Sequence, residues 1–119
     1  MDLILIVDDD LLFTARLEAA LREGGLQPRI VSPSRAAATT EGAAAAVVNV
    51  ATPRGVEAVR ALRAVPGPRL SIVGYCGHRD VAQWEAARAA GCDRVVPNAA
   101  VVRDVCGLLT NLRRSRPRG

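Results

Sequence analysis

The sequence predicts a single α/β domain of three layers, in which helices cover both faces of a doubly wound, five-stranded parallel sheet. Its 119 residues, half of them hydrophobic, fit one ordinary globular domain. Five short apolar runs alternate with segments of helical periodicity, which is the pattern of successive βα units. The first run, Leu3–Val7, contains no polar residue, as expected for a strand buried on both faces at the centre of a parallel sheet.

The remaining elements of the first half follow in order along the chain. A helix is expected at Leu11–Glu23, where apolar residues recur at helical spacing and a glycine pair follows. Next comes a short strand over residues 26–31. It contains Pro28, which cannot donate a hydrogen bond to a ladder, so we expect this strand at an edge of the sheet. Ser32, followed by proline, is typical of a helix N-cap and predicts a short alanine-rich helix that ends near Gly42.

The second half repeats the alternation three times. We expect strands over residues 44–50, 69–75 and 94–96 and helices over residues 54–65, 80–90 and 99–112. A Pro-Gly-Pro break ends the first of these helices, and Asp80 with Gln83 resembles a capping box at the start of the second. The predicted domain covers residues 1–112, and residues 113–119 form a basic tail that we expect to be disordered.

The five units predict the strand order 2-1-3-4-5, which is common for open doubly wound sheets of this size. Ligands of such sheets bind beyond the carboxyl ends of the strands, where the strand order reverses. That point lies between the first and third strands. The sequence places three aspartates, residues 8–10, after the first strand and Asn49 near the end of the third. Polar residues therefore follow the strands where the architecture predicts a site.

The aspartates suit a hard divalent cation. Like charges held together are costly without a partner, and carboxylates on a loop above a sheet are the oxygen ligands that Mg²⁺ prefers. Asp10 has the alternative role of N-cap for the helix that follows. Because that role does not explain Asp8 and Asp9, these two residues are the predicted metal ligands.

The charge balance separates the tail from the body of the domain. All 16 basic residues are arginine, and four of them lie in residues 113–119, so the other 12 balance the 12 acidic residues. The net charge of +4 therefore gives little support to nucleic-acid binding, which the shortage of aromatic residues for base stacking also disfavours. No run approaches the ~20 apolar residues of a membrane helix, and the start lacks the basic region of a signal peptide. We expect a cytoplasmic protein without membrane contact.

The cysteines and the single histidine indicate no further chemistry. Cys76, Cys92 and Cys106 lack C-x-x-C spacing, so neither a disulfide framework nor a structural zinc site is expected. A nucleophilic pair of Cys76 and His78 is conceivable, but no oxyanion-hole motif accompanies it, and we favour a polar pair on a loop. Cys92 and Cys106 are interpreted as small core residues, and Trp84 as either a core residue or an interface anchor.

Four motifs in the correct order and spacing resemble those of response-regulator receiver domains (CheY-like), the chemotaxis-regulator-like modules of two-component signalling. They are ILIVDDD at residues 4–10, NVATPRG at 49–55, IVGYCGH at 72–78 and GCDRVVPNA at 91–99. The resemblance covers essentially the whole chain and implies the flavodoxin-like, CheY-like version of the predicted fold. In that family the third strand ends in a phosphoacceptor aspartate and the fourth in threonine or serine. An aromatic residue and Lys-Pro precede the last helix.

The sequence differs from the family pattern at each of the four positions that take part in phosphorylation and switching. Asn49 stands at the phosphoacceptor position, and a carboxamide is not nucleophilic enough to accept a phosphoryl group. Cys76 replaces the switch hydroxyl, Val95 replaces the aromatic residue, and Asn98 replaces the lysine that pairs with the phosphate. By the resemblance, the family's three aspartates and one lysine give the pocket a formal charge of −2. Asp8 and Asp9, with the neutral Asn49 and Asn98, give the same charge. Because the lysine is lost together with the aspartate, no lysine ammonium group is left without its partner. We expect an atypical receiver that has lost phosphorelay switching.

The expected function is that of a stand-alone, non-enzymatic receiver domain in signal transduction that acts through protein–protein contact. By the resemblance, the contact surface comprises the helix over residues 80–90, the strand over 94–96 and the last helix over 99–112. A signalling partner or a second copy of the chain is expected to dock there.

Two further expectations concern charge pairs and ligands. Arg94 and Arg103, together with the acids Asp93 and Asp104, offer charge pairs for a homodimer. The alternative function is a small-ligand or cation-binding regulator of the same fold. Any Mg²⁺ at Asp8 and Asp9 is expected to bind weakly, in the millimolar range or poorer, with the amide oxygen of Asn49 as a neutral third ligand.

Overall fold

The computed structural model describes residues 2–115, with side chains described for residues 2–112. The sheet contains the strands β1 (Leu3–Val7), β2 (Gln27–Val31), β3 (Ala43–Asn49), β4 (Ser71–Cys76) and β5 (Arg94–Pro97). The helices are α1 (Leu11–Glu23), the 3₁₀ helix η1 (Pro33–Thr39), α2 (Pro53–Ala64), α3 (Val81–Ala90) and α4 (Asn98–Ser115). All paired strands are parallel, and their order is β2-β1-β3-β4-β5, which confirms the predicted topology.

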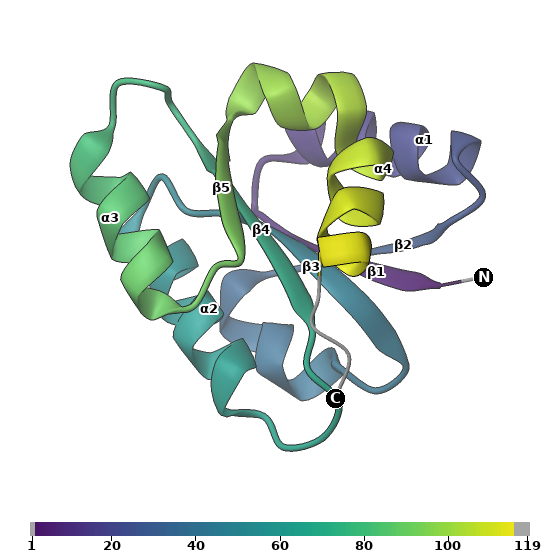
Figure 1. Cartoon of the computed structure of the whole chain (residues 1–119), viewed down its shortest axis with the longest axis horizontal. Helices are drawn as coiled ribbons and strands as arrows, with labels where there is room; N and C mark the ends of the chain where they lie inside the picture. Colours follow the sequence, from purple (N-terminus) through teal and green to yellow (C-terminus); the bar gives the residue numbers. More distant parts are fainter. Residues whose placement is uncertain (1, 116–119) are drawn as a thin grey trace.

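Helices cover both faces of the sheet (Figure 1). α1 and α4 lie together on one face, and η1, α2 and α3 cover the other. Because successive strand side chains point to opposite faces, β1 supplies both cores: Leu5 and Val7 pack on the η1–α2–α3 side, and Ile4 and Ile6 on the α1–α4 side. β1 is therefore buried along its whole length, as its unbroken apolar sequence predicts.

The helix starts agree with the sequence only in part. Asp10 caps α1 as predicted, because its carboxylate accepts hydrogen bonds from the backbone N–H groups of Leu12 and Phe13. The capping box predicted at Asp80 is wrong: its side chain makes no cap hydrogen bond, and Gln83 instead donates to the carbonyl of Val50. The Ser32 side chain likewise makes no cap hydrogen bond, and the short element after it is a 3₁₀ helix.

The last helix is kinked and longer than expected. Its backbone leaves the helical region at Asp104 (φ −152°, ψ 50°), and the Asp104 carboxylate accepts a hydrogen bond from the N–H of Gly107, as an N-cap of the second segment would. The helix continues to Ser115, three residues past its predicted end, and residues 116–119 of the expected tail lie outside the described residues. Within the described chain, no helix combines the length and apolar character needed to cross a membrane.

Candidate functional site

The polar residues predicted to form a site meet where the strand order reverses. Asp8 directly follows β1, Asn49 ends β3, and Tyr75 lies one residue before the end of β4. In the register of the sheet, Asn49 is opposite Tyr75. Asp8 is only 6% exposed, although it carries a carboxylate. A buried carboxylate needs hydrogen-bond partners, and the neighbouring strands supply them.

Three donors converge on the Asp8 carboxylate. Its Oδ1 accepts hydrogen bonds from the backbone N–H of Asp10 at 3.0 Å and from Nδ2 of Asn49 at 3.1 Å. Its Oδ2 accepts a hydrogen bond from the Tyr75 hydroxyl at 2.6 Å. An ionised carboxylate offers roughly four acceptor positions, so most of the capacity of Asp8 is used within the protein. Asp8 therefore links the carboxyl ends of β1, β3 and β4.

Tyr75 is held rigidly. Its side chain is 1% exposed, and its ring stacks on that of Phe13 from α1, with the ring centroids 4.9 Å apart. Burial, and secondly the hydrogen bond to Asp8, raises the pKa of Tyr75 above its ordinary value. The phenol therefore stays protonated and remains a donor to Asp8.

Asn49 is oriented from both ends of its amide. Its Oδ1 accepts a hydrogen bond from the backbone N–H of Ala51 at 2.9 Å, which leaves Nδ2 to donate to Asp8. The adjoining helix packs tightly here, since a Cβ on Gly55 would lie 1.7 Å from the carbonyl oxygen of Asn49. Thr52 caps α2 by accepting a hydrogen bond from the N–H of Gly55. The glycine of the Pro-x-Gly sequence after β3 is thus required for packing, and Pro53 is the first residue of α2.

Asp9 takes part in an exposed ion pair. A guanidinium nitrogen of Arg54, in the first turn of α2, lies 3.0 Å from its carboxylate. Both side chains are more than half exposed, so the pair contributes little to stability. The pair nevertheless places a positive charge beside the acidic pocket.

The residues of this pocket disfavour tight binding of a divalent cation, because three donors already occupy the Asp8 carboxylate. Within the described chain, no group of three or more His, Cys, Asp or Glu side chains is arranged to hold a metal ion. The amide oxygen of Asn49, predicted as a third ligand, accepts from Ala51, and the amide presents its donor end to Asp8. The cavity lined by Asp8, Asp9 and Arg54 measures about 170 Å³, below the roughly 300–1,000 Å³ of small-molecule pockets, which disfavours the alternative of a small-ligand regulator but does not exclude an ion.

The other predicted switch positions lie apart from this network. Cys76 ends β4 and is fully buried, so the interpretation of a loop pair with the exposed His78 is wrong. Burial also raises the pKa of the Cys76 thiol. Val95 is buried in the same core cluster as Cys76. Asn98, the first residue of α4, is exposed, and no hydrogen bond joins it to the described acidic residues.

Asp93 lies at the opposite end of the sheet and not on the surface where it was expected to pair with a second copy. It forms ion pairs with Arg63 at 2.8 Å and Arg69 at 2.6 Å, and it accepts a hydrogen bond from the N–H of Ile72. Arg63 also donates to the carbonyls of Leu70 and Gly91. These contacts join α2 to the starts of β4 and β5, so the role of Asp93 is structural.

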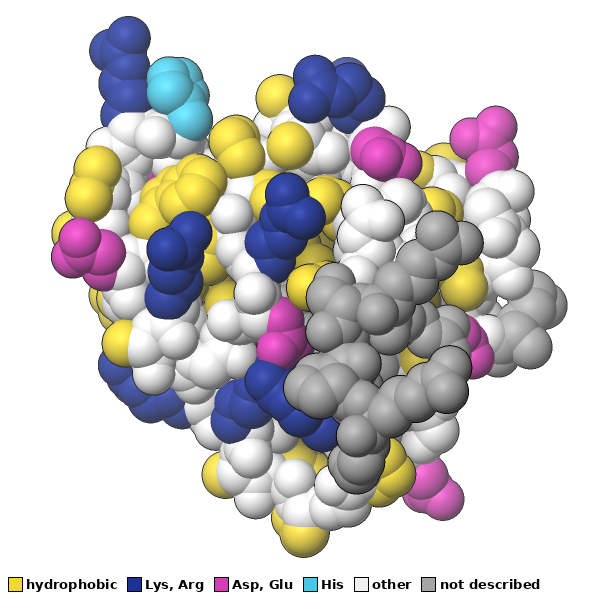
Figure 2. Space-filling model, viewed as in Figure 1, with side chains coloured by type: hydrophobic (Ala, Val, Ile, Leu, Met, Phe, Trp, Pro, Cys, Tyr) yellow, Lys and Arg dark blue, Asp and Glu magenta, His cyan; other side chains and the backbone are white. Residues whose placement is uncertain are grey.

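The surface formed by α3, β5 and α4, called the α3–β5–α4 face below, carries a shallow hollow of about 480 Å³. Arg88, Arg94 and Arg103 line it and form no ion pair with another described side chain. Figure 2 shows dark blue arginine side chains spread over this face. Trp84 both lines the hollow and packs against the core, with its indole N–H donating to the carbonyl of Gly77. Asp104 lines the hollow as well, so its charged side chains are three arginines and one aspartate, and its lining is positive overall.

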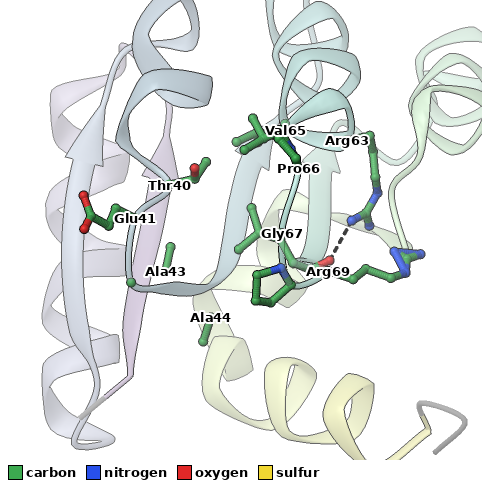
Figure 3. A pocket seen from close by; sticks show the side chains of 13 residues that line it. Thr40, Glu41, Ala43, Ala44, Arg63, Val65, Pro66, Gly67 and Arg69 are labelled. Atoms are coloured by element: carbon green, nitrogen blue, oxygen red, sulfur yellow. Dashed lines mark hydrogen bonds between the residues drawn. The ribbon is translucent and has the colours of Figure 1, made fainter. Parts of the chain in front are cut away.

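A larger cavity, of about 700 Å³, lies between the starts of β3 and β4 (Figure 3). Thr40 and Glu41 lie on one side, and Arg63 and Arg69 on the other. Ligands of parallel α/β sheets bind at the carboxyl ends of the strands, whereas this cavity lies at the amino ends. The polar groups of Arg63 are already taken up by the protein. The cavity therefore gives little support to a ligand-binding function.

Sequence reasoning missed Tyr75, Arg54 and Arg63. One signal for Tyr75 was available, because a phenol within an otherwise apolar, buried strand needs a polar partner, and Asp8 follows a strand of the same sheet. The partners of Arg54 and Arg63 depend on side-chain reach between elements, and no local sequence pattern indicates them.

Comparisons with known proteins agree with this architecture. No protein-family model and no curated protein matches the chain. Among solved structures, the receiver domain of the sensor histidine kinase PA1611 from Pseudomonas aeruginosa PAO1 is 22% identical, with a TM-score of 0.82 over 96% of this chain and 98% of that chain. That structure has a magnesium ion coordinated in its active site cleft.

Two further structures give the same result. The receiver domain of the TMAO respiratory system response regulator TorR is 21% identical, with a TM-score of 0.81 over 96% of this chain and 98% of that chain. A CheY-like receiver domain protein from Methanospirillum hungatei JF-1 is 17% identical, with a TM-score of 0.76 over 98% of this chain and 99% of that chain. The chain therefore has the fold of the response-regulator receiver domains.

Proposed function

We propose that this chain is a cytoplasmic, receiver-type module of two-component signalling that is not phosphorylated and acts through protein–protein contact. The observation that carries the proposal is the end of β3, where a receiver has its phosphoacceptor aspartate. Here the residue is Asn49, and its amide is held by Asp8 on one side and Ala51 on the other. A carboxamide in this position is not a nucleophile for phosphoryl transfer.

The other positions support the loss of switching. Cys76 and Val95 pack in one apolar cluster, where neither provides the hydroxyl or the rotating aromatic ring of a working receiver. Asn98 carries no charge to pair with a phosphate. We therefore assign no enzymatic step to any of these residues. We propose that the module works in a single conformation.

The α3–β5–α4 face is the proposed contact surface. Three exposed arginines and one aspartate, Asp104, line its hollow, and this positive balance favours a partner with an acidic surface. A homodimer held by charge pairs is less favoured, because Asp93 is engaged by Arg63 and Arg69 at the far end of the sheet. Cation binding at the acidic pocket, which the magnesium-containing neighbour makes plausible, is proposed to be millimolar or poorer.

Phosphorylation is tested by intact-mass measurement after incubation with acetyl phosphate and Mg²⁺. The wild-type chain is expected to gain no phosphoryl group, and Asn49→Asp at most a weak, short-lived one. A hydroxylamine-sensitive adduct at Asn49 of the wild-type chain would contradict the proposal. As a matched variant, Asp9→Asn leaves Asn49 in place and is expected to behave like the wild type.

The proposed contact surface is tested by reversing the charge of two of its arginines. Complexes recovered from the native cell are expected to be lost in the double variant Arg94→Glu/Arg103→Glu and kept in Arg16→Glu, which alters an exposed arginine on α1. Light scattering of the purified chain distinguishes self-association from a different partner. Equal recovery of the complexes by the wild type, the double variant and Arg16→Glu would contradict the assignment of the contact surface to this face.

A further inference from the structure

The acidic pocket of this chain is surrounded by hydrogen-bond donors. A backbone N–H, a carboxamide N–H and a phenol O–H all point at the Asp8 carboxylate, at 2.6–3.1 Å. A cation bound at Asp8 would compete with these donors for the same lone pairs. The donors also withdraw electron density from the carboxylate and so weaken it as a metal ligand.

Two of the donors cannot easily turn away. Rotating the Asn49 amide to offer its oxygen would leave the N–H of Ala51 without its acceptor and would remove one of the three donors to Asp8. Moving Tyr75 would break its stacking on Phe13 inside the core formed by α1 and α4. The arrangement is therefore fixed by packing as well as by hydrogen bonds.

We propose that Tyr75 and Asn49 hold the affinity of this pocket for divalent cations in the millimolar range or poorer and use Asp8 as the acceptor that ties the carboxyl ends of β1, β3 and β4 together. Asp8 thus has a structural role, and Tyr75 is the residue that decides whether the pocket admits a metal. Arg54, paired with the exposed Asp9, adds a positive charge at the entrance but is not the main barrier, because that pair is open to solvent.

The proposal concerns the same pocket as the proposed function and deepens it. It is tested without any phosphoryl donor, so the two can fail separately: a chain that bound cations at Asp8 could still lack a phosphoacceptor at Asn49.

The test titrates Mn²⁺ into the ¹⁵N-labelled full chain and follows paramagnetic broadening of the backbone amides of Asp10 and Ala51. For the wild type, broadening is expected only at millimolar Mn²⁺ or above. Tyr75→Phe keeps the ring and removes the donor, and it is expected to bind Mn²⁺ about tenfold more tightly. Adding Asn49→Asp replaces a second donor with a carboxylate and is expected to give about a hundredfold gain over the wild type.

Two controls make the outcome decisive. Arg54→Gln is expected to change the affinity by less than about threefold, since it removes only the exposed charge. Asn49→Asp alone provides a second variant should Tyr75→Phe fail to fold, and it too is expected to bind Mn²⁺ more tightly than the wild type.

The hydrogen bond itself has a signature in the wild-type spectrum. The Tyr75 hydroxyl proton is expected to be protected from exchange and visible by NMR, and to vanish in Tyr75→Phe. Micromolar Mn²⁺ binding by the wild type, or an affinity of the folded Tyr75→Phe variant that is unchanged within about twofold, would overturn the proposal.

Discussion

Arg63 provides the most demanding prediction of stability, because one side chain joins three elements at the amino ends of the strands. Its guanidinium donates to the carbonyls of Leu70 at 2.7 Å and Gly91 at 2.8 Å and pairs with Asp93 at 2.8 Å, and its side chain is 19% exposed. Removing one partner of a largely buried pair costs about 3–5 kcal/mol. Asp93 keeps Arg69 as a partner, so we expect Arg63→Met to lose about 3 kcal/mol, or about 10–15 °C in Tm.

The assay is urea unfolding followed by far-ultraviolet circular dichroism. Arg60→Met is the matched control, because Arg60 lies on the same helix and forms an exposed ion pair with Glu57 that is worth about 0.5 kcal/mol or less. Arg63→Lys is expected to lose most of the stability that Arg63→Met loses, since a single ammonium cannot reproduce the fork of three donors. Equal unfolding free energies for Arg63→Met and Arg60→Met would refute this reasoning.

Three other predictions concern packing, capping and pH. Gly55→Ala is expected to destabilise the fold by about 1–3 kcal/mol in the same urea assay, because its Cβ would collide with the Asn49 carbonyl, whereas Gly77→Ala, which meets open space, stays within about 0.5 kcal/mol. Asp10→Ala removes the cap of α1 and is expected to cost about 1 kcal/mol, a loss that Asp10→Asn largely avoids. Burial raises the pKa of Cys92 from 9.0 to about 12. Between those values the unfolded chain has lost a proton that the folded chain keeps, so stability falls as pH rises from 9 towards 12, and Cys92→Ala should flatten that part of the profile.

The sequence was sufficient for the fold because its strongest signals are local. β1 is an unbroken apolar run, Pro28 marks an edge strand, and α1 begins at a capping aspartate. Such patterns act within one element, and the handedness and order of parallel connections follow from general rules once the elements are known. The positions of Asp8 and Asn49 follow in turn, since both lie at strand ends.

The sequence was not sufficient for the interactions within the site. Tyr75 and Asp8 are 67 residues apart, and only the register of the sheet brings the hydroxyl to the carboxylate. Gln83 shows the same limit, because its distant partner, the carbonyl of Val50, took the place of the capping contact that the local pattern predicts. Asp93 was assigned to a surface on sequence position alone, whereas two arginines hold it at the other end of the sheet. Competition between local and distant partners is decided by packing, which a single sequence does not display.

By our proposal, the pocket of this receiver fold does not respond to a phosphoryl group. The most direct measurement compares ¹H–¹⁵N spectra of the full chain before and after addition of beryllofluoride with Mg²⁺. We expect no shifts at Asp8 or Asn49 beyond those of a salt control, and none at Cys76 or Val95. Saturable shifts that start at Asn49 and extend to Val95 on β5 would show a working switch and would contradict the account.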